Sequence, residues 1–440
     1  MRFSCIVHSR SIVLCLFLAA CLLLCVALLV APAGVRADPQ RYNGTGKEVM
    51  LQGFHWTSYN PANNSNKRWY RIIAENAGVI KDAGFDYVWF PPPSRSAASD
   101  NGYLPTQWYA LENGYGNKDE LKRAVAALKP TMALCDIVIN HRCGTATGGA
   151  DFTNPTFGNI EQNKAAIVTG DECQCGKGHF EERHRDGSIS EGNEGGRDLD
   201  HTSPLVQMRV KEFQQKLKDE IGFAGWRYDQ VRGYNGFYVG LYNDASQPVL
   251  SVGEFWDNSA QKVVDWVDET GGKSMAFDFP TRDALVSATL KQDYSRLKTL
   301  AGKPPGLIGL WPEMSVTFIE NHDTEPVRDG GNKRFPDGKI MQGYVYILTH
   351  PGMPCVFWRH FFDQGEEQKG QIVRLIALRK KAGITSRSSL FIEPNTDGKY
   401  AAKIDEKVAM KIGPAPWSPG DGWQLELDGP DYAVWKKNVP

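Results

Sequence analysis

The sequence predicts a (β/α)8 TIM barrel, of the α/β class, with a small domain inserted after strand three and a C-terminal antiparallel β domain. Short apolar runs alternate with segments of helical periodicity through most of the 440 residues, which is typical of a parallel sheet. Eight such strand–helix units predict a closed barrel, with active-site residues at the strand ends. After residue 382 the pattern changes to short alternating segments punctuated by glycine-containing turns, which indicates antiparallel strands.

The first 37 residues differ from the rest of the chain. Arg2 and Arg10 lead into an almost unbroken apolar run over 11–33, and Val35-Arg36-Ala37 follows as a small-x-small cleavage pattern. We expect a signal peptide over 1–37, and therefore a protein that is secreted or enters the lumen of the secretory pathway and has no membrane contact after cleavage. An uncleaved anchor is the alternative, because the run is long enough to span a bilayer.

The composition excludes some partners and leaves others open. The net charge is −1 and charged residues make up 23% of the chain, so nothing favours a nucleic acid as partner. Aromatic residues make up 11%, which allows both a large core and exposed rings that stack on a sugar-like ligand. Two Asn-x-Ser/Thr sequons, at Asn43 and Asn63, lie in polar sequence and predict a glycoprotein. A monomer is the default expectation.

The cysteines after the leader are odd in number, so they cannot all pair within one chain. They are Cys135, Cys143, Cys173, Cys175 and Cys355. Cys173 and Cys175 are too close in sequence for an easy mutual bridge, so we expect Cys143 to pair with one of them. Cys135 and Cys355 lie within apolar strands and are expected to be buried thiols.

The first half of the barrel is predicted from three strands and the helices between them. The strands are expected at 49–54, 85–90 and 132–139, and an apolar stripe at helical spacing predicts a helix after the first. Asn117 and Glu120 form a capping-box pattern at the start of the helix before the third strand.

The strand–helix rhythm breaks between Arg142 and Asp198. This stretch is rich in Gly, Asn, Glu and Asp and is too long for a plain loop in a compact domain. We therefore expect a small inserted domain or a lid, whose acids are well placed to hold a hard cation. The resulting segments are the signal peptide (1–37), the barrel's first part (38–141), the insert (142–198), the barrel's second part (199–382) and the C-terminal β domain (383–440).

Regularity resumes at Ser203 and Pro204, where an N-cap and first-turn pattern opens a helix that leads into a strand through Trp226. Further barrel strands are expected at 249–253, 276–279, 316–319 and 354–358. In the C-terminal domain, alternating segments predict strands at 400–404, 408–412 and 432–435.

Acids and histidines follow four of the predicted strands, and in a barrel these strand ends converge on one mouth. They include Asp136, Asn140 and His141 after the third strand, Arg227 and Asp229 after the fourth, Glu254 after the fifth, and Asn321, His322 and Asp323 after the seventh. Alternation sends Arg227 and Asp229 to one face and Tyr228 to the other, and the adjacent cation favours the ionised carboxylate that a nucleophile needs. Such a group suits glycoside hydrolysis, in which one carboxylate attacks the anomeric carbon and a protonated carboxyl donates to the leaving oxygen.

Each of these residues alone also has a structural interpretation. Glu254 could pair with a lysine, His141 and His322 could be packed, hydrogen-bonded histidines, and Asp323 could cap the next helix. Their joint occurrence on successive strand ends of one predicted barrel favours catalysis.

Four segments resemble, in order and spacing, the motifs of the plant-type α-amylases of the (β/α)8 glycoside hydrolase superfamily. They are CDIVINHR at 135–142, GWRYDQVRGY at 225–234, VGEFW at 252–256 and FIENHDT at 318–324. The similarity runs from about Glu48 to the C-terminus. It implies an endo-acting, retaining hydrolase of internal α-1,4-glucosidic bonds, with starch, amylose, glycogen or maltooligosaccharides as substrate. The alternatives are a transglycosylase or exo-acting relative on the same fold, and a non-catalytic glucan-binding protein, which should lack one of the three catalytic acids.

The resemblance also assigns roles to individual residues. It implies that Asp229 is the nucleophile and Glu254 the general acid/base, about 5 Å apart as a retaining double displacement requires. Asp323 would grip hydroxyls of the distorted sugar and stabilise the transition state. The residues that would bind the substrate or orient these acids are Tyr103 as a stacking platform, His141 and His322 as hydrogen-bond partners of the sugar, and Arg227 as the partner of Asp229.

A calcium ion between barrel and insert is a further implication of the resemblance. Its ligands in this chain would be Asn140, Asp198 and the carbonyl of Gly233, and oxygen ligands from scattered loops suit Ca²⁺. The insert departs from the family pattern at Ser188, where the pattern has another Asp ligand, so either a nearby acid substitutes or the site is weaker. The candidate substitutes are Asp186, Glu191 and Glu194.

Overall fold

The structure is a computed structural model, and it describes residues 42–97, 100–144, 149–180, 196–325, 334–394 and 398–438. The predicted signal peptide and its cleavage pattern therefore lie outside the described residues. Among the helices in these ranges, none combines the length and the apolar character that crossing a membrane requires.

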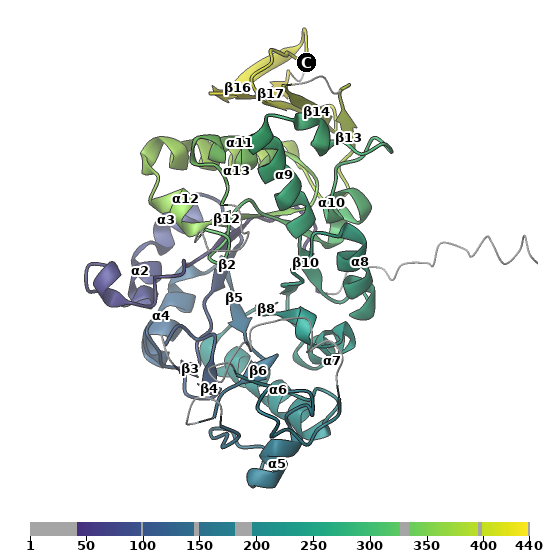
Figure 1. The fold of residues 1–440 in the computed structure, drawn as a ribbon. Helices are drawn as coiled ribbons and strands as arrows, with labels where there is room; N and C mark the ends of the chain where they lie inside the picture. The colour runs from purple at the N-terminus through teal and green to yellow at the C-terminus, as the bar shows by residue number, and fades with distance from the viewer. Residues whose placement is uncertain are drawn as a thin grey trace, which may run out of the picture. The chain divides into compact units, whose positions relative to one another are not determined.

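Eight parallel strands close into a barrel, which confirms the predicted architecture (Figure 1). In chain order they are β1 (Met50–Gln52), β2 (Tyr87–Phe90), β5 (Met132–Ile137), β8 (Gly225–Tyr228), β9 (Leu250–Gly253), β10 (Met275–Phe277), β11 (Ser315–Thr317) and β12 (Met353–Phe357). Successive strands pair in parallel, and β12 pairs with β1 to close the ring. Every strand overlaps an apolar run that predicts it, and nearly all of its residues are buried.

Helices follow the barrel strands, and they include those that the helical periodicity predicts. They are α2 (Trp69–Glu75), α3 (Ala77–Asp82), α4 (Lys118–Leu128), α6 (Pro204–Lys216), α7 (Gly236–Ser246), α8 (Ala260–Glu269), α9 (Phe279–Lys291), α10 (Leu307–Leu310), α11 (Ile340–Thr349), α12 (Trp358–Phe362) and α13 (Gly365–Ala382). The capping box at Asn117 and Glu120 is confirmed, because each side chain accepts a hydrogen bond from the other's backbone N–H. One helix expected after β1 is instead two, broken at Asn76, whose side chain donates to the Ile72 carbonyl.

The insert leaves and re-enters the barrel through two short antiparallel strands, β6 (His141–Arg142) and β7 (Arg197–Asp198). A second short pair of strands, β3 (Arg95–Ser96) and β4 (Pro105–Gln107), precedes the insert in the chain. The helix α5 (Ile160–Ala165) lies within the insert. Arg142 is fully buried; its guanidinium donates to the Pro155 carbonyl at 2.7 Å and lies 5.0 Å from the centre of the Trp108 ring. This arginine fixes the start of the insert, because a buried cation needs such partners.

The expected pairing of Cys143 with Cys173 or Cys175 is wrong. Cys173 and Cys175 are bonded to each other, and Cys143 is a buried free thiol. The reason is local: Gln174 has a φ of 52°, and the turn that it makes brings the two Cα atoms to 5.1 Å, within the range that a disulfide spans. Cys135 and Cys355 are buried free thiols, as predicted.

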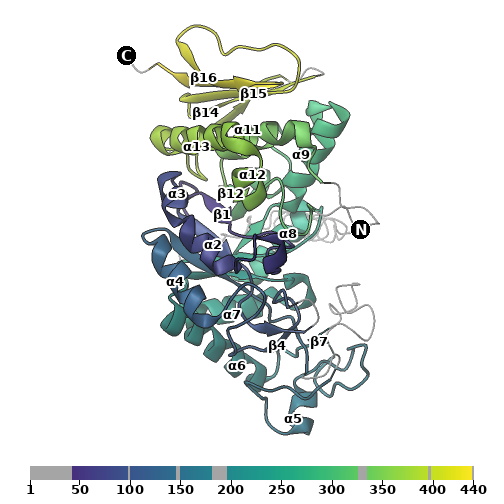
Figure 2. The same ribbon diagram turned by 90° about the vertical axis from the view of Figure 1, so that its left-hand side faces the viewer.

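The C-terminal domain is a five-stranded antiparallel sheet, as the alternating segments predict. Its strands are β13 (Leu390–Ile392), β14 (Tyr400–Ile404), β15 (Val408–Ile412), β16 (Trp423–Gly429) and β17 (Tyr432–Lys437), in the order β13-β14-β15-β17-β16. One face of the sheet lies against α11 and α13 (Figure 2). The Tyr432 hydroxyl donates to Gln371 of α13 at 2.7 Å, and the Tyr400 hydroxyl lies 2.8 Å from His350 just after α11.

Candidate active site

The C-terminal end of β8 carries the centre of the site. The side chains of Arg227 and Asp229 lie on the same side, and the Arg227 guanidinium donates to Asp229 Oδ1 at 2.7 Å. Tyr228 points the opposite way, as strand alternation predicts: its hydroxyl donates to Asn243 at 2.7 Å and accepts from Gln214 at 2.9 Å. The strand therefore supplies two charged groups to the site and one tyrosine to the packing beneath α6 and α7.

Arg227 contacts carboxylates from three neighbouring strands. The parallel register sets Asp136 of β5 opposite Arg227, and Glu254 directly follows β9 on the other side. Arg227 Nη1 donates to both oxygens of Asp136 at 2.8 and 2.9 Å, and Nη2 lies 2.8 Å from Glu254 Oε2. The guanidinium also lies over the Trp89 ring, 4.8 Å from its centre. One fully buried cation thus holds the predicted nucleophile by a hydrogen bond and lies within ion-pair distance of the predicted acid/base.

The two oxygens of Asp229 have different surroundings. Oδ1 is held by Arg227, whereas Oδ2 is buried and has no hydrogen-bond partner among the described residues. A buried carboxylate oxygen without a partner is costly in a finished fold. Such an oxygen is therefore a candidate for contact with a substrate.

Glu254 lies in surroundings that favour its protonated form. Its Oε2 accepts the backbone N–H of Gln230 at 3.1 Å. Burial raises the pKa of Glu254 well above the ordinary value of 4.5, and the charges of Asp229 and Asp323 raise it further against the opposing effect of Arg227. A carboxyl whose pKa is raised holds its proton to higher pH and can serve as a general acid.

A tight turn after β11 presents Asp323. The Asn321 side chain accepts the backbone N–H groups of Asp323 and Thr324, both at 2.9 Å, and so closes this turn. His322 Nε2 lies 3.1 Å from Asp323 Oδ2. Gln52 Nε2, at the end of β1, lies 2.9 Å from Nδ1, the other ring nitrogen of His322.

Aromatic rings lie beside these acids. The Tyr103 hydroxyl donates to Asp136 at 2.8 Å, and its ring is stacked on His322 with the centres 5.3 Å apart and the planes within 17°. Trp56 lies parallel to both rings, 5.9 Å from Tyr103 and 5.8 Å from His322. His141 Nε2 lies 2.8 Å from the Tyr103 carbonyl, so His141 holds the backbone of this aromatic group.

Trp56 and Gln52 are part of the site, but the sequence reasoning missed them. Both belong to the segment at the end of β1, a strand end that carries no acid. The signal that would have found them is their place at the same barrel mouth as the catalytic candidates.

The three predicted calcium ligands are also brought together. Asn140 Nδ2 lies 3.4 Å from Asp198 Oδ1, and both residues are buried. Asn140 Oδ1 is buried without a hydrogen-bond partner among the described residues, and a Cβ placed on Gly233 would lie 1.9 Å from it, so this backbone approaches the amide closely. An unpaired buried oxygen next to a buried carboxylate fits a hard cation.

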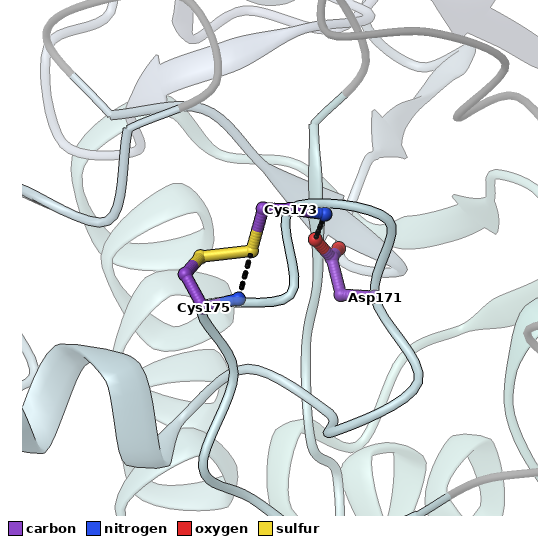
Figure 3. Close-up of side chains that lie close together, drawn as sticks. All are labelled: Asp171, Cys173 and Cys175. Atoms are coloured by element: carbon purple, nitrogen blue, oxygen red, sulfur yellow. Dashed lines mark hydrogen bonds between the residues drawn. A yellow bond between two sulfur atoms is a disulfide. The ribbon is translucent and has the colours of Figure 1, made fainter.

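Two acids of the insert join this group without having been predicted. Oxygens of Asp171, Glu172 and Asp198 lie within 4.8 Å of one another. Asp171 stands in the disulfide loop, next to Cys173 (Figure 3). The substitutes expected for Ser188, which are Asp186, Glu191 and Glu194, lie outside the described residues.

Similar proteins were found for most of the chain. Residues 381–436 match the family described as the α-amylase C-terminal β-sheet domain. The chain is 39% identical over 414 residues to α-amylase 3, chloroplastic, of Arabidopsis thaliana. The aligned region covers 89% of this chain and 44% of that protein. It is 37% identical over 420 residues to probable α-amylase 2 of the same plant, with 91% and 97% covered. The crystal structure of an Anoxybacillus α-amylase has the same fold, with a TM-score of 0.65 over 90% of this chain and 99% of that one at 17% identity.

Proposed function

Because the chain belongs to the α-amylase family of glycoside hydrolases, we propose that it cleaves internal α-1,4-glucosidic bonds of starch-like glucans by a retaining double displacement. The substrates would be starch, amylose, glycogen or maltooligosaccharides. The observation that carries the proposal is the single Arg227 guanidinium, which contacts Asp229 on one nitrogen and Glu254 on the other.

In the first step, Asp229 Oδ2 attacks the anomeric carbon. This oxygen is suited to the attack because Arg227 holds only Oδ1. Glu254 gives its proton to the glycosidic oxygen, and the bond to the leaving chain breaks as the ester to Asp229 forms. The raised pKa of Glu254 favours the protonated form from which this donation starts.

In the second step, Glu254 is ionised and takes a proton from water. The resulting oxygen attacks the anomeric carbon from the side that the leaving chain vacated, and the ester to Asp229 breaks. Two inversions at one carbon give net retention. Asp323, oriented by the turn that Asn321 closes and by the contact with His322, would bind hydroxyls of the distorted sugar. The stacked rings of Tyr103 and Trp56 would pack against sugar faces.

The residues around Asn140 fit the calcium ion that the family resemblance implies. Asn140 and Asp198 would hold it together with the Gly233 carbonyl, and Asp171 and Glu172 are further oxygen donors in the insert. When bound, the ion would supply charge neutralisation that joins the insert to the barrel. Asp198 lies directly opposite His141 in the β6–β7 pair, so this junction would support the backbone that holds Tyr103.

For the apolar leader, we propose entry into the secretory pathway. Of the two sequons, Asn63 is exposed, whereas the Asn43 side chain donates to the Gly272 carbonyl at 3.2 Å, which favours Asn63 as the glycan acceptor. The name of one relative includes the word chloroplastic, so a plastid destination is the competing outcome. Expression of the full chain in plant cells, followed by endoglycosidase digestion, tests this: a mass shift that Asn63→Gln abolishes supports the proposal, and an unglycosylated protein in plastids refutes it.

Product analysis on amylose tests the reaction. The purified enzyme should release α-configured maltooligosaccharides of mixed length, and a calcium chelator should abolish this activity. Asp229→Asn should release none. Chains longer than the substrate would indicate transfer to sugar instead of water, and release of one short product from chain ends would indicate exo action. Binding of amylose without any product would refute hydrolysis.

A further inference from the structure

A disulfide and a buried carboxylate lie together in one loop of the insert, outside the catalytic group (Figure 3), and this carboxylate contacts Asp198 of the candidate cation site. Cys173 and Cys175 are half-buried, and the adjacent Glu172 and Gln174 are exposed, so a small thiol can reach the bond. We propose that this disulfide is a redox modification site at which a dithiol acts, and that its reduction weakens cation binding by the insert. The inference rests on the cation site of the proposed function and adds a regulator to it.

Asp171 links the disulfide to the cation site. Its Oδ1 accepts the backbone N–H of Cys173 at 2.9 Å and pairs with Arg197 at 2.7 Å. Its Oδ2 accepts the backbone N–H of Asp198 at 2.8 Å. The side chains of Asp171 and Arg197 are buried, so the position of this carboxylate depends on these donors. Of these three donors to Asp171, only the Cys173 N–H belongs to the loop that the disulfide closes.

The closed ring holds that donor in place. Gln174, between the two cysteines, has a φ of 52°, in the left-handed region that residues other than glycine rarely adopt. Without the covalent bond the two sulfurs must separate, and Gln174 can return to negative φ. The Cys173 N–H then moves relative to Asp171, and Asp171 in turn is the partner of the Asp198 backbone.

The reduction has a preferred direction. The backbone N–H of Cys175 donates to Cys173 Sγ at 3.0 Å and stabilises negative charge on that sulfur. A thiolate of the dithiol therefore attacks Cys175 Sγ, the bond between the two cysteines breaks, and Cys173 leaves as a thiolate and takes a proton from water. The second thiolate of the dithiol then attacks the dithiol's first sulfur, which is bonded to Cys175 in the mixed disulfide. Cys175 is released as a thiolate and takes a second proton. Two electrons and two protons pass to the protein, and the dithiol becomes a cyclic disulfide.

Calcium titration of the full chain tests the coupling without using activity as the readout. Isothermal titration calorimetry compares the oxidised protein with protein reduced by dithiothreitol, and mass spectrometry after alkylation confirms that Cys173 and Cys175 have become free. We expect the dissociation constant for Ca²⁺ to rise about tenfold on reduction, the effect of losing one hydrogen bond to a charged acceptor.

Three variants identify the cause of the change. Cys173→Ser with Cys175→Ser should bind calcium as weakly as the reduced protein, whether or not dithiothreitol is present. Cys143→Ala removes a buried free thiol of the same insert and should keep the full redox response. Gln174→Gly tolerates positive φ without the covalent ring, so its reduced form should lose less affinity. This variant keeps both cysteines, so it tests the coupling even where the double variant does not fold.

The outcomes separate this inference from the proposed function. Equal affinities in the oxidised and reduced protein would overturn the redox coupling and leave the cation site standing. Absence of calcium binding by the oxidised protein would overturn both. A redox response that persists in the double serine variant would place the effect at other cysteines and overturn the assignment.

Discussion

Replacement of Glu254 by glutamine tests the proposed acid/base role most directly. Glutamine keeps the volume, and its amide oxygen can still accept the Gln230 N–H that Glu254 accepts at 3.1 Å. What is lost is the transferable proton. General acid–base catalysis contributes about 10² to 10⁴ in rate, so kcat should fall by that factor, or about 3 to 5 kcal/mol in barrier height. Binding of maltooligosaccharides should be retained.

The same substitution should raise stability at neutral pH. The pKa of Glu254 is raised in the folded protein relative to its ordinary value of 4.5. Between these two values the folded chain binds more protons than the unfolded chain, so stability falls as pH rises through the window. Glutamine does not titrate. The variant and the wild type should therefore melt alike near pH 4, and the variant should melt at a higher temperature above the folded pKa.

Two measurements check both effects: kcat/KM for a maltooligosaccharide, and Tm, each from pH 4 to 9. The matched control is Glu269→Gln, which changes an acid of α8 that accepts the Gly236 backbone N–H and should leave the pH–rate profile unchanged. A loss of activity smaller than tenfold in Glu254→Gln, or an alkaline limb of the rate profile identical to that of the wild type, would refute the acid/base assignment.

Three further substitutions give distinct outcomes. Asp198→Ala should lower Tm, and added calcium should rescue it poorly; an unchanged melting curve would count against the metal assignment. Tyr228→Phe should lower the free energy of unfolding by about 1 to 3 kcal/mol, because Asn243 and Gln214 both lose a buried hydrogen-bond partner. Its kcat should stay normal; a large loss of kcat in a variant that still resists urea would contradict the placement of Tyr228 outside the site. Trp56→Ala removes one of the stacked rings and should lower kcat/KM for maltooligosaccharides about tenfold with little change in Tm, whereas unchanged kinetics would exclude the ring from substrate contact.

The barrel, and the grouping of the candidate catalytic residues at its mouth, could be predicted because their signals are local. Buried parallel strands appear as short apolar runs. The residue that follows each run lies at the barrel mouth, and this placement does not depend on the sequence of the connecting helices. The relation of Arg227, Tyr228 and Asp229 follows from strand alternation alone, and the contacts of these residues agree with it.

The insert was harder to predict because its structure depends on particular side chains instead of periodicity. The bond between Cys173 and Cys175 needs the left-handed backbone conformation of Gln174. The sequence around Gln174 contains no pattern that predicts this conformation. Asp171 reaches Asp198 only because the chain folds back from α5 to β7, a contact between residues far apart in an irregular stretch. The family resemblance pointed to acids near Ser188, which lie outside the described residues. Among the described residues, the buried acid beside Asp198 is Asp171, from the loop before them.

The arrangement around Arg227 also explains how one buried cation can serve both steps of the proposed mechanism. Before reaction Asp229 carries the negative charge and Glu254 holds a proton; in the covalent intermediate Asp229 is a neutral ester and Glu254 is ionised. The total charge around the guanidinium is the same in both states, because one unit moves from Asp229 to Glu254. Arg227 lies 2.7 Å from the first carboxylate and 2.8 Å from the second, so it is paired in either state. Asp136, held by two contacts from the same guanidinium and by the Tyr103 hydroxyl, does not change charge in either step and keeps that cation in place. Little reorganisation of the protein is then needed as the charge moves, which is the condition for electrostatic preorganisation.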